Sequence, residues 1–132
     1  MNKNINHWEE YSEPPDSNIT LKFSNKKYEC AEKIYNLRRK RDKIFKTGLF
    51  SDPAWDILLD LYISERSNKE IYVTSACLAA GVPASTGLRW ITILIQNGYV
   101  ERRGDAADAR RSLVSLTSLG RDLLDTLFAS ET

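Results

Sequence analysis

Pro83 to Asn97, PASTGLRWITILIQN, is the stretch of sequence that decides the fold. Proline suits the first turn of a helix, because its missing N–H would have no partner there. Gly98 ends the helix, since glycine tolerates a left-handed backbone. The expected helix has one polar and one apolar face, so one side can pack on a core. The polar face holds Ser85, Thr86, Arg89 and Thr92, and the apolar face holds Trp90, Ile91, Leu94 and Ile95.

The polar face has two interpretations. Hydroxyl side chains and a forked guanidinium suit phosphates and base edges in a major groove, which predicts a DNA recognition helix. The alternative is a plain amphipathic core helix. Upstream, Thr74 or Ser75 can cap a short helix of small residues through Ala80, and Gly81 leads into Pro83. Two helices joined by a few residues that include glycine form a helix-turn-helix pattern.

A β-hairpin is expected directly after this helix. Tyr99 to Arg103 forms the first strand, residues 104–108 are turn-prone, and Leu113 to Leu116 forms the second strand. Strand, charged turn and strand after a helix-turn-helix describe a wing. Arg110 near the tip can enter a minor groove, where the potential favours a cation, and Asp108 is close enough in sequence to hold it. The alternative is a set of solvated turn residues.

A long helix is expected over Ser24 to Lys46, with Ser24 as its cap and apolar residues at helical spacing. Its middle carries four adjacent positive charges, Arg38 to Arg41. They form a solvated face, a contact to DNA phosphates, or the flank of a dimer interface, and the sequence does not separate these interpretations. Residues 21–47 hold ten Lys or Arg, so a net charge of only +1 still leaves a local positive field.

Two more helices are expected around the hairpin and the helix-turn-helix. Asp52-Pro53 predicts a helix start with an aspartate cap, and Asp56 and Asp60 are expected on its solvated face. A short β-prone piece follows at residues 71–73. Thr117 is expected to cap the last helix, and Gly120 in its first turn indicates a close contact there.

Composition limits the functions that the chain can have. Its 132 residues suffice for one core, and its hydrophobic fraction of 42% and charged fraction of 28% are ordinary. No apolar run approaches the ~20 residues of a membrane span, and no signal-peptide core precedes residue 20, so we expect a cytoplasmic protein. Cys30 and Cys77 make neither a disulfide framework nor a metal site, and His7 has no nucleophile partner. We therefore expect no catalytic residues, metal or cofactor.

Several motifs between Leu49 and Phe128 are those of a known family. Ser85-Thr86…Arg89 precedes Leu94…Gly98-Tyr99-Val100-Glu101-Arg102, and the wing reads Asp105-x-x-Asp108-x-Arg110-x-x-x-Val114-x-Leu116-Thr117-x-x-Gly120. This span resembles the MarR family of winged-helix transcription regulators. The resemblance implies dimers on palindromic DNA, with the recognition helix in the major groove and Arg110 in the minor groove. It places Ser85, Thr86, Arg89 and Thr92 on DNA, while Arg103 and Arg111 are expected at phosphates from charge and position.

The sequence departs from that family in three respects. Little helical length follows Thr117, so a homodimer is expected to depend on the helix of residues 24–46, and a small-molecule effector has no support from the residues. Gly87 stands where a larger apolar residue is usual, which predicts a recognition helix weaker by about 0.5–1 kcal/mol than with alanine. The recognition helix is also apolar over much of its circumference, with Leu88, Ile93 and Ile95.

The sequence predicts an α+β, mainly α, winged helix-turn-helix with a long N-terminal helix and a short C-terminal helix. We expect a disordered acidic tail at residues 1–20, a basic amphipathic helix at 21–47 and a DNA-binding domain at 48–132. The expected function is sequence-specific transcription regulation on double-stranded DNA, with Asp105 and Asp108 supporting the wing. The alternative is a winged-helix module that binds proteins, which the apolar excess on the recognition helix favours.

Overall fold

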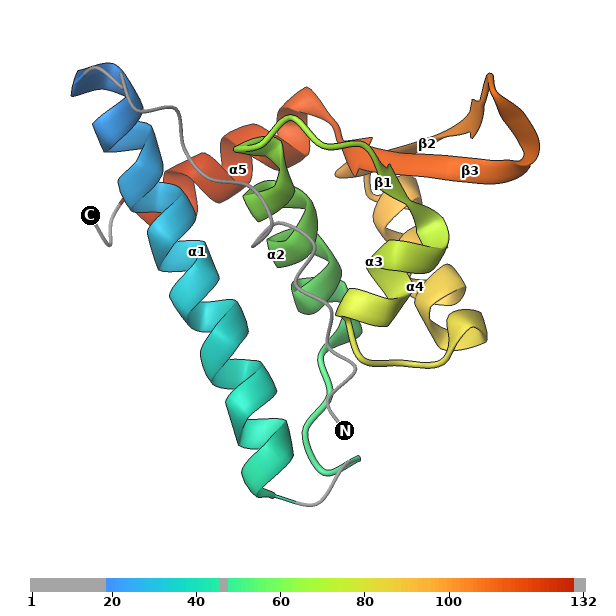
Figure 1. The fold of residues 1–132 in the computed structure, drawn as a ribbon, viewed down its shortest axis with the longest axis horizontal. Helices are drawn as coiled ribbons and strands as arrows, with labels where there is room; N and C mark the ends of the chain where they lie inside the picture. The colour runs from blue at the N-terminus through green and yellow to red at the C-terminus, as the bar shows by residue number, and fades with distance from the viewer. Residues whose placement is uncertain (1–18, 46–47, 130–132) are drawn as a thin grey trace.

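The computed structural model describes residues 19–45 and 48–129 (Figure 1). Helices surround a central helix, and a small sheet lies at one end of the molecule. The elements in chain order are α1 (Ile19–Ile44), α2 (Pro53–Glu65), β1 (Ile71–Tyr72), α3 (Val73–Ala79), α4 (Ala84–Gln96), β2 (Val100–Asp105), β3 (Asp108–Leu116) and α5 (Ser118–Ala129). The predicted fold class, mainly helical with a wing, is confirmed.

The long N-terminal helix starts earlier than predicted. α1 begins at Ile19, so Ser24 lies inside the helix and is not its cap. The acidic tail predicted for residues 1–20 falls outside the described residues, apart from the first two positions of α1. Within α1, Ala31 and Tyr35 are fully buried and belong to the same apolar core as α2.

α2 is the centre of the core, because almost all of its residues from Asp56 to Ser64 are buried. Pro53 occupies its first turn as predicted, but the Asp52 side chain makes no capping hydrogen bond. The backbone carbonyl of Asp52 instead accepts the N–H of Asp56 at 3.0 Å. The aspartate therefore starts the helix through its main chain.

The predicted solvated face of α2 is wrong. Asp56 is 1% exposed and Asp60 is 0% exposed, because α2 is covered by α1, α3 and α4. Buried carboxylates need partners. Arg38 and Arg39 of α1 supply them for Asp56, with nitrogen–oxygen distances of 2.6 and 2.7 Å. Arg38 and Arg39, two of the four residues in the basic run, are thus neither solvated nor available to phosphates. None of the three interpretations of the sequence included this buried ion pair.

The three strands form an antiparallel sheet in the order β1-β3-β2. Val100 pairs with Leu116 and Ile71 with Val114, and all four side chains are buried at the base of the sheet. The β2–β3 hairpin extends from this base on the side of the molecule opposite α1 (Figure 1). Its register shifts between Gly104 and Asp105, next to the tip. Both strands run further towards the tip than the sequence predicted.

α5 is attached to the hairpin and to α2. The Thr117 hydroxyl accepts the Gly120 N–H at 3.0 Å, which confirms the predicted cap. A Cβ at Gly120 would collide with the backbone carbonyl of Tyr99, which confirms the predicted close contact. Arg121 makes a two-pronged ion pair with Glu65 of α2 at 2.7 and 2.8 Å. These contacts hold the wing base, α5 and α2 together.

Among the described residues, no single helix is long and apolar enough to cross a membrane. α3 and α4 together meet that criterion by length and composition alone, although they are bent by 106°. Over the same residues, no three His, Cys, Asp or Glu side chains are grouped so that they could hold a metal ion.

Candidate nucleic-acid interface

α3 and α4 form the predicted helix-turn-helix. They meet at 106°, within the range of about 90–120° for this motif. Gly81 in the link has a φ of +70°, a conformation that glycine adopts without strain. Gly87 of α4 lies directly against Cys77 of α3, where any Cβ would collide with the Cys77 Sγ. The glycine that the sequence marked as a weakness is therefore the contact that lets the two helices approach.

The predicted apolar face of α4 is only partly buried: Trp90 is half-buried and Ile95 is 36% exposed. Ile91 and Leu94 are buried against the core with Gly87. The predicted DNA-facing residues lie elsewhere on the helix: Ser85, Arg89 and Thr92 are exposed, and Thr86 is half-buried. The Thr92 hydroxyl donates to the Leu88 carbonyl at 3.0 Å, so its oxygen remains to accept a hydrogen bond.

The start of α4 is open to an acceptor. Pro83 is the N-cap residue and not the first helical residue, and no side chain caps this end. The first backbone N–H to find an intrahelical partner is that of Gly87, which donates to the Pro83 carbonyl at 2.9 Å. The N–H groups before it point out of the helix end, where the helix dipole favours an anion.

The wing tip presents one highly exposed arginine. Arg110 is 89% exposed, and its guanidinium lies 3.0 and 3.1 Å from the two Asp108 carboxylate oxygens. The Asp108 carboxylate also accepts the Arg110 backbone N–H at 3.0 Å. The contact predicted from sequence spacing is therefore present. These hydrogen bonds hold the pKa of the Asp108 carboxyl below its ordinary value, with the Arg110 side chain as the largest cause.

Arg111 lies 3.6 Å from the Asp108 carboxylate that also holds Arg110, and it has two further partners. Its guanidinium lies 3.2 Å from the Asp105 carboxylate and 4.3 Å from the centre of the Tyr72 ring. The Tyr72 hydroxyl donates to the same carboxylate at 3.1 Å. The Ala107 backbone N–H also donates to it and is the largest cause of the lowered pKa of Asp105. Tyr72 was absent from the predicted set, because its link to the tip depends on β1 pairing with β3.

Arg103 lies on the same face of the sheet as Leu113 and Tyr72, its neighbours across the strands. Its guanidinium pairs with Glu70 at 2.6 Å, and both side chains are more than half exposed. Arg102 is exposed on β2 and pairs across the sheet with Val114, so it projects from the opposite face. Arg110 and Arg111 share the Asp108 carboxylate at the tip, whereas Arg103 pairs with Glu70 and stands apart from them.

The apolar excess on the recognition helix is partly exposed. Leu88 and Ile95 are 37% and 36% exposed, and Leu78 of α3 is 45% exposed. Trp90 is half-buried and packs against the core. These side chains are the surface on which the protein-binding alternative depends.

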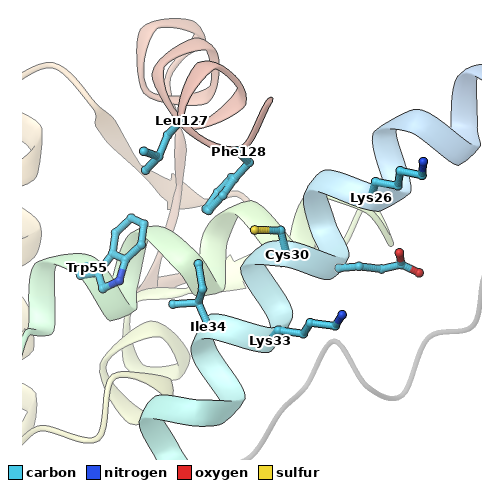
Figure 2. Close-up of a pocket in the computed structure, with 8 residues that line it drawn as sticks. Lys26, Cys30, Lys33, Ile34, Trp55, Leu127 and Phe128 are labelled. Carbon is cyan, nitrogen blue, oxygen red and sulfur yellow. The ribbon is translucent and has the colours of Figure 1, made fainter. Parts of the chain in front are cut away.

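A second feature lies away from the helix-turn-helix. α1, α2 and α5 enclose a hollow of about 620 Å³, and Figure 2 shows Cys30, Ile34, Trp55 and Phe128 facing one another across it. Lys26 and Lys33 of α1 lie at its rim. Glu29 also lines the hollow, so apolar side chains in its interior meet an edge with two lysines and one glutamate.

Comparison with solved structures identifies the architecture. MepR of S. aureus in its DNA-binding conformation matches with a TM-score of 0.54 and 20% identity, over 79% of this chain and 76% of MepR. A probable transcriptional regulator of Pseudomonas aeruginosa matches with a TM-score of 0.51 and 22% identity, over 89% of this chain and 80% of its own. The fold is a MarR-type winged helix.

The MarR-type fold is also shared with the PcaV transcriptional regulator of Streptomyces coelicolor, solved with its natural ligand. That match has a TM-score of 0.51 and 17% identity, over 77% of this chain and 71% of PcaV. No protein-family sequence model and no curated protein sequence matches the chain. At this level of identity, the likeness establishes the fold, which has α4 as its second helix-turn-helix element and β2–β3 as its wing.

Proposed function

We propose that this protein is a sequence-specific, DNA-binding transcription regulator. One observation carries the proposal: α4 buries its apolar side and exposes Ser85, Arg89 and Thr92, while a hairpin presents the 89% exposed Arg110. A helix of this kind enters a major groove, and a cation at a hairpin tip suits a minor groove. The solved regulators of the same fold, among them MepR in its DNA-binding conformation, support this assignment.

The roles of the side chains follow from their chemistry. Arg89 and the hydroxyl groups of Ser85, Thr86 and Thr92 contact base edges and phosphates, and the uncapped N–H groups of α4 contact a phosphate. Arg111 and Arg103 contact the backbone beside the wing. Arg103 must leave Glu70 to do so, which costs little because an exposed ion pair contributes only about 0–1 kcal/mol. Asp105 and Asp108 hold the tip arginines in place before DNA arrives.

The proposed regulator acts as a homodimer. The C-terminal end of α1 and the residue after it carry exposed apolar side chains: Leu37 is 67%, Ile44 69% and Phe45 53% exposed. α5 carries a second apolar stripe at helical spacing: Leu119, Leu123 and Leu127 are 51%, 48% and 50% exposed. Side chains of this size on two helix faces are a candidate association surface. Two recognition helices would then reach successive major grooves about one helical turn apart.

The hollow between α1, α2 and α5 is the candidate effector site, if this regulator has one. PefR of Streptococcus agalactiae was solved with heme and PcaV with its natural ligand. The apolar interior suits an apolar molecule, and Lys26 and Lys33 beside Glu29 suit a polar group on it. We assign no catalytic activity to the chain and propose a cytoplasmic location for it.

The test is selection of bound fragments from a random double-stranded DNA library, followed by titration at low and moderate salt. The proposal expects a palindromic motif and an affinity that falls steeply with salt, because phosphate contacts release counterions. An asymmetric half-site would retain the DNA binding and reject the dimer. Absence of both enrichment and salt-dependent binding would reject the regulator and favour the protein-binding module with its surface at Leu78, Leu88 and Ile95.

Within that assay, Arg110→Ala measures the contribution of the wing. If the arginine makes a good groove contact, its loss weakens binding by about 1–3 kcal/mol. Lys33→Ala is the matched control, since it removes the same charge from an exposed position on α1, at the rim of the hollow. Equal affinities of Arg110→Ala and the unaltered protein would remove the wing from the interface.

A further inference from the structure

α1 lies outside the helix-turn-helix, yet two of its side chains form hydrogen bonds with one backbone carbonyl of α3. The Tyr35 hydroxyl donates to the Ala79 carbonyl at 2.6 Å, and Nη1 of Arg39 lies 3.4 Å from the same oxygen. Tyr35 is 0% exposed and Arg39 is 6% exposed. The last residue of α3 is therefore bound from another helix, inside the protein.

This carbonyl is a place where a cation is favoured. The last carbonyls of a helix lack intrahelical partners, and the C-terminal end carries partial negative charge. α3 has no basic residue in its own last turn. Arg39, from a helix about forty positions earlier, supplies the cation that α3 lacks.

Arg39 is itself fixed from a third direction. Its Nη2 donates to the Asp56 Oδ2 at 2.7 Å, and the Arg38 Nε donates to Oδ1 of the same carboxylate at 2.6 Å. Asp56 belongs to α2 and is 1% exposed. A planar guanidinium that is bound at two of its nitrogens has little freedom to shift. The position of Arg39 is thus set by the core helix of the protein.

The same guanidinium touches the turn that leads into the recognition helix. A Cβ built on Gly81 would lie 2.9 Å from the Arg39 Nη1. Gly81 has a φ of +70°, and α4 begins three residues later at Ala84. The direction in which α4 leaves α3 is determined over these few residues, and Arg39 packs on them directly.

We propose that Arg39 is a positioning residue for DNA recognition: with Tyr35, it fixes the orientation of α4 relative to α3 from the distant helix α1. The proposal rests on the proposed DNA-binding function. It differs from a simple packing role, in which loss of the side chain lowers stability but leaves the folded α3–α4 unit unchanged.

The experiment uses the full chain with Arg39→Lys and, separately, Tyr35→Phe. Lysine keeps a charge near Asp56 but cannot bind the carboxylate and the Ala79 carbonyl through two fixed nitrogens. Phenylalanine removes one hydroxyl group. Backbone amide chemical shifts of α4 are measured by NMR where each variant is fully folded, and affinity for the selected DNA is measured under the same conditions. We expect shifts throughout α4 and affinity lower by roughly ten-fold.

Arg121→Lys is the matched control. Arg121 makes a comparable two-pronged ion pair with Glu65 between α5 and α2, away from the α3–α4 turn. Its replacement should leave the α4 amides unchanged. If Arg39→Lys does not fold, Tyr35→Phe carries the test by itself.

Unchanged α4 shifts and DNA affinity in folded variants would overturn the proposal, whatever happens to stability. Failure of the unaltered protein to bind DNA would reject the proposed function. The α4 shifts would still decide whether Arg39 positions the helix.

Discussion

Gly87 and Gly120 are positions inside helices where a side chain has no room. A Cβ at Gly87 would collide with the Cys77 Sγ, and one at Gly120 would collide with the Tyr99 carbonyl. The second obstacle is backbone and cannot rotate away. Gly104, in contrast, has no heavy atom within 4 Å of the position that a Cβ would take.

Alanine at these glycines gives a direct test of the packing. We expect Gly120→Ala and Gly87→Ala each to lower the free energy of unfolding by about 1–3 kcal/mol, as overpacked sites do. Gly104→Ala is the control and should be close to neutral. Urea unfolding followed by circular dichroism measures all three. A neutral Gly120→Ala would show that the wing base and α5 are not in contact in solution.

The wing-tip carboxylates titrate in a predictable direction. Asp105 and Asp108 have lowered pKa values, so the contacts that they make stabilise the folded tip above the ordinary aspartate pKa of about 3.9 and are lost as pH falls through the lower folded value. Both carboxyl signals should therefore titrate below that pKa in a carbon NMR titration. Arg110→Gln removes the largest cause for Asp108 and should raise its pKa. The same variant should leave Asp105 nearly unaltered, since the Ala107 N–H is the main cause there.

Between elements, the Asp56 carboxylate is the main polar link from α1 to α2. Its single negative charge balances only one of the two guanidiniums that contact it, those of Arg38 and Arg39. Asp42, a more exposed carboxylate, lies 3.3 Å from Arg39. Removing one partner of a buried pair leaves an uncompensated charge. The helix pair therefore depends on this one side chain more than on any surface ion pair described above.

Asp56→Asn should lower the free energy of unfolding by about 3–5 kcal/mol, because the two guanidiniums then lose the buried negative charge and one of its two acceptor oxygens. Asp122→Asn, on the exposed side of α5, is the control for loss of a carboxylate and should have little effect. Thermal unfolding compares the two variants. A loss below 1 kcal/mol for Asp56→Asn would mean that water or Asp42 replaces the buried carboxylate.

At the scale of the whole molecule, the exposed apolar stripes predict association. Leu123→Glu and Leu37→Glu place a charge in the α5 and α1 stripes, and each should shift the protein towards monomer in sedimentation equilibrium. Ser118→Glu and Asn36→Glu add the same charge on the same helices at exposed polar positions outside the two stripes and should have no effect. If only one leucine variant dissociates the dimer, that helix forms the interface. A protein that is monomeric without any substitution would contradict the dimer.

Local signals predicted much of this fold, and distant contacts account for the errors. Gly98 marked the end of α4 correctly and Pro83 marked its start to within one residue, because helix ends depend on neighbouring residues. Asp56 and Asp60 were placed in solvent because helical periodicity describes one helix at a time. The arginines that pair with Asp56, Arg39 and Arg38, are 17 and 18 positions away on α1.

The candidate interface divides in the same way. The Asp108–Arg110 contact follows from a spacing of two residues and was predicted. The hydrogen bond from Tyr72 to Asp105 depends on the pairing of β1 with β3. The Arg103–Glu70 ion pair joins positions that are 33 residues apart in the sequence. No pattern within a helix or strand signals such pairs.

Because Cys77 and Gly87 are in contact, substitutions at these two positions should be coupled during evolution. A homologue with alanine at position 87 needs a smaller side chain than cysteine at position 77. Without that second change, α3 and α4 move apart, and the position of the DNA-reading surface changes. Sequences that diverged from this one should therefore show a small residue at one of the two positions whenever the other is larger. In a library randomised at positions 77 and 87 and selected for folded protein, variants with a small residue at one position should survive. Variants with large residues at both positions should be lost.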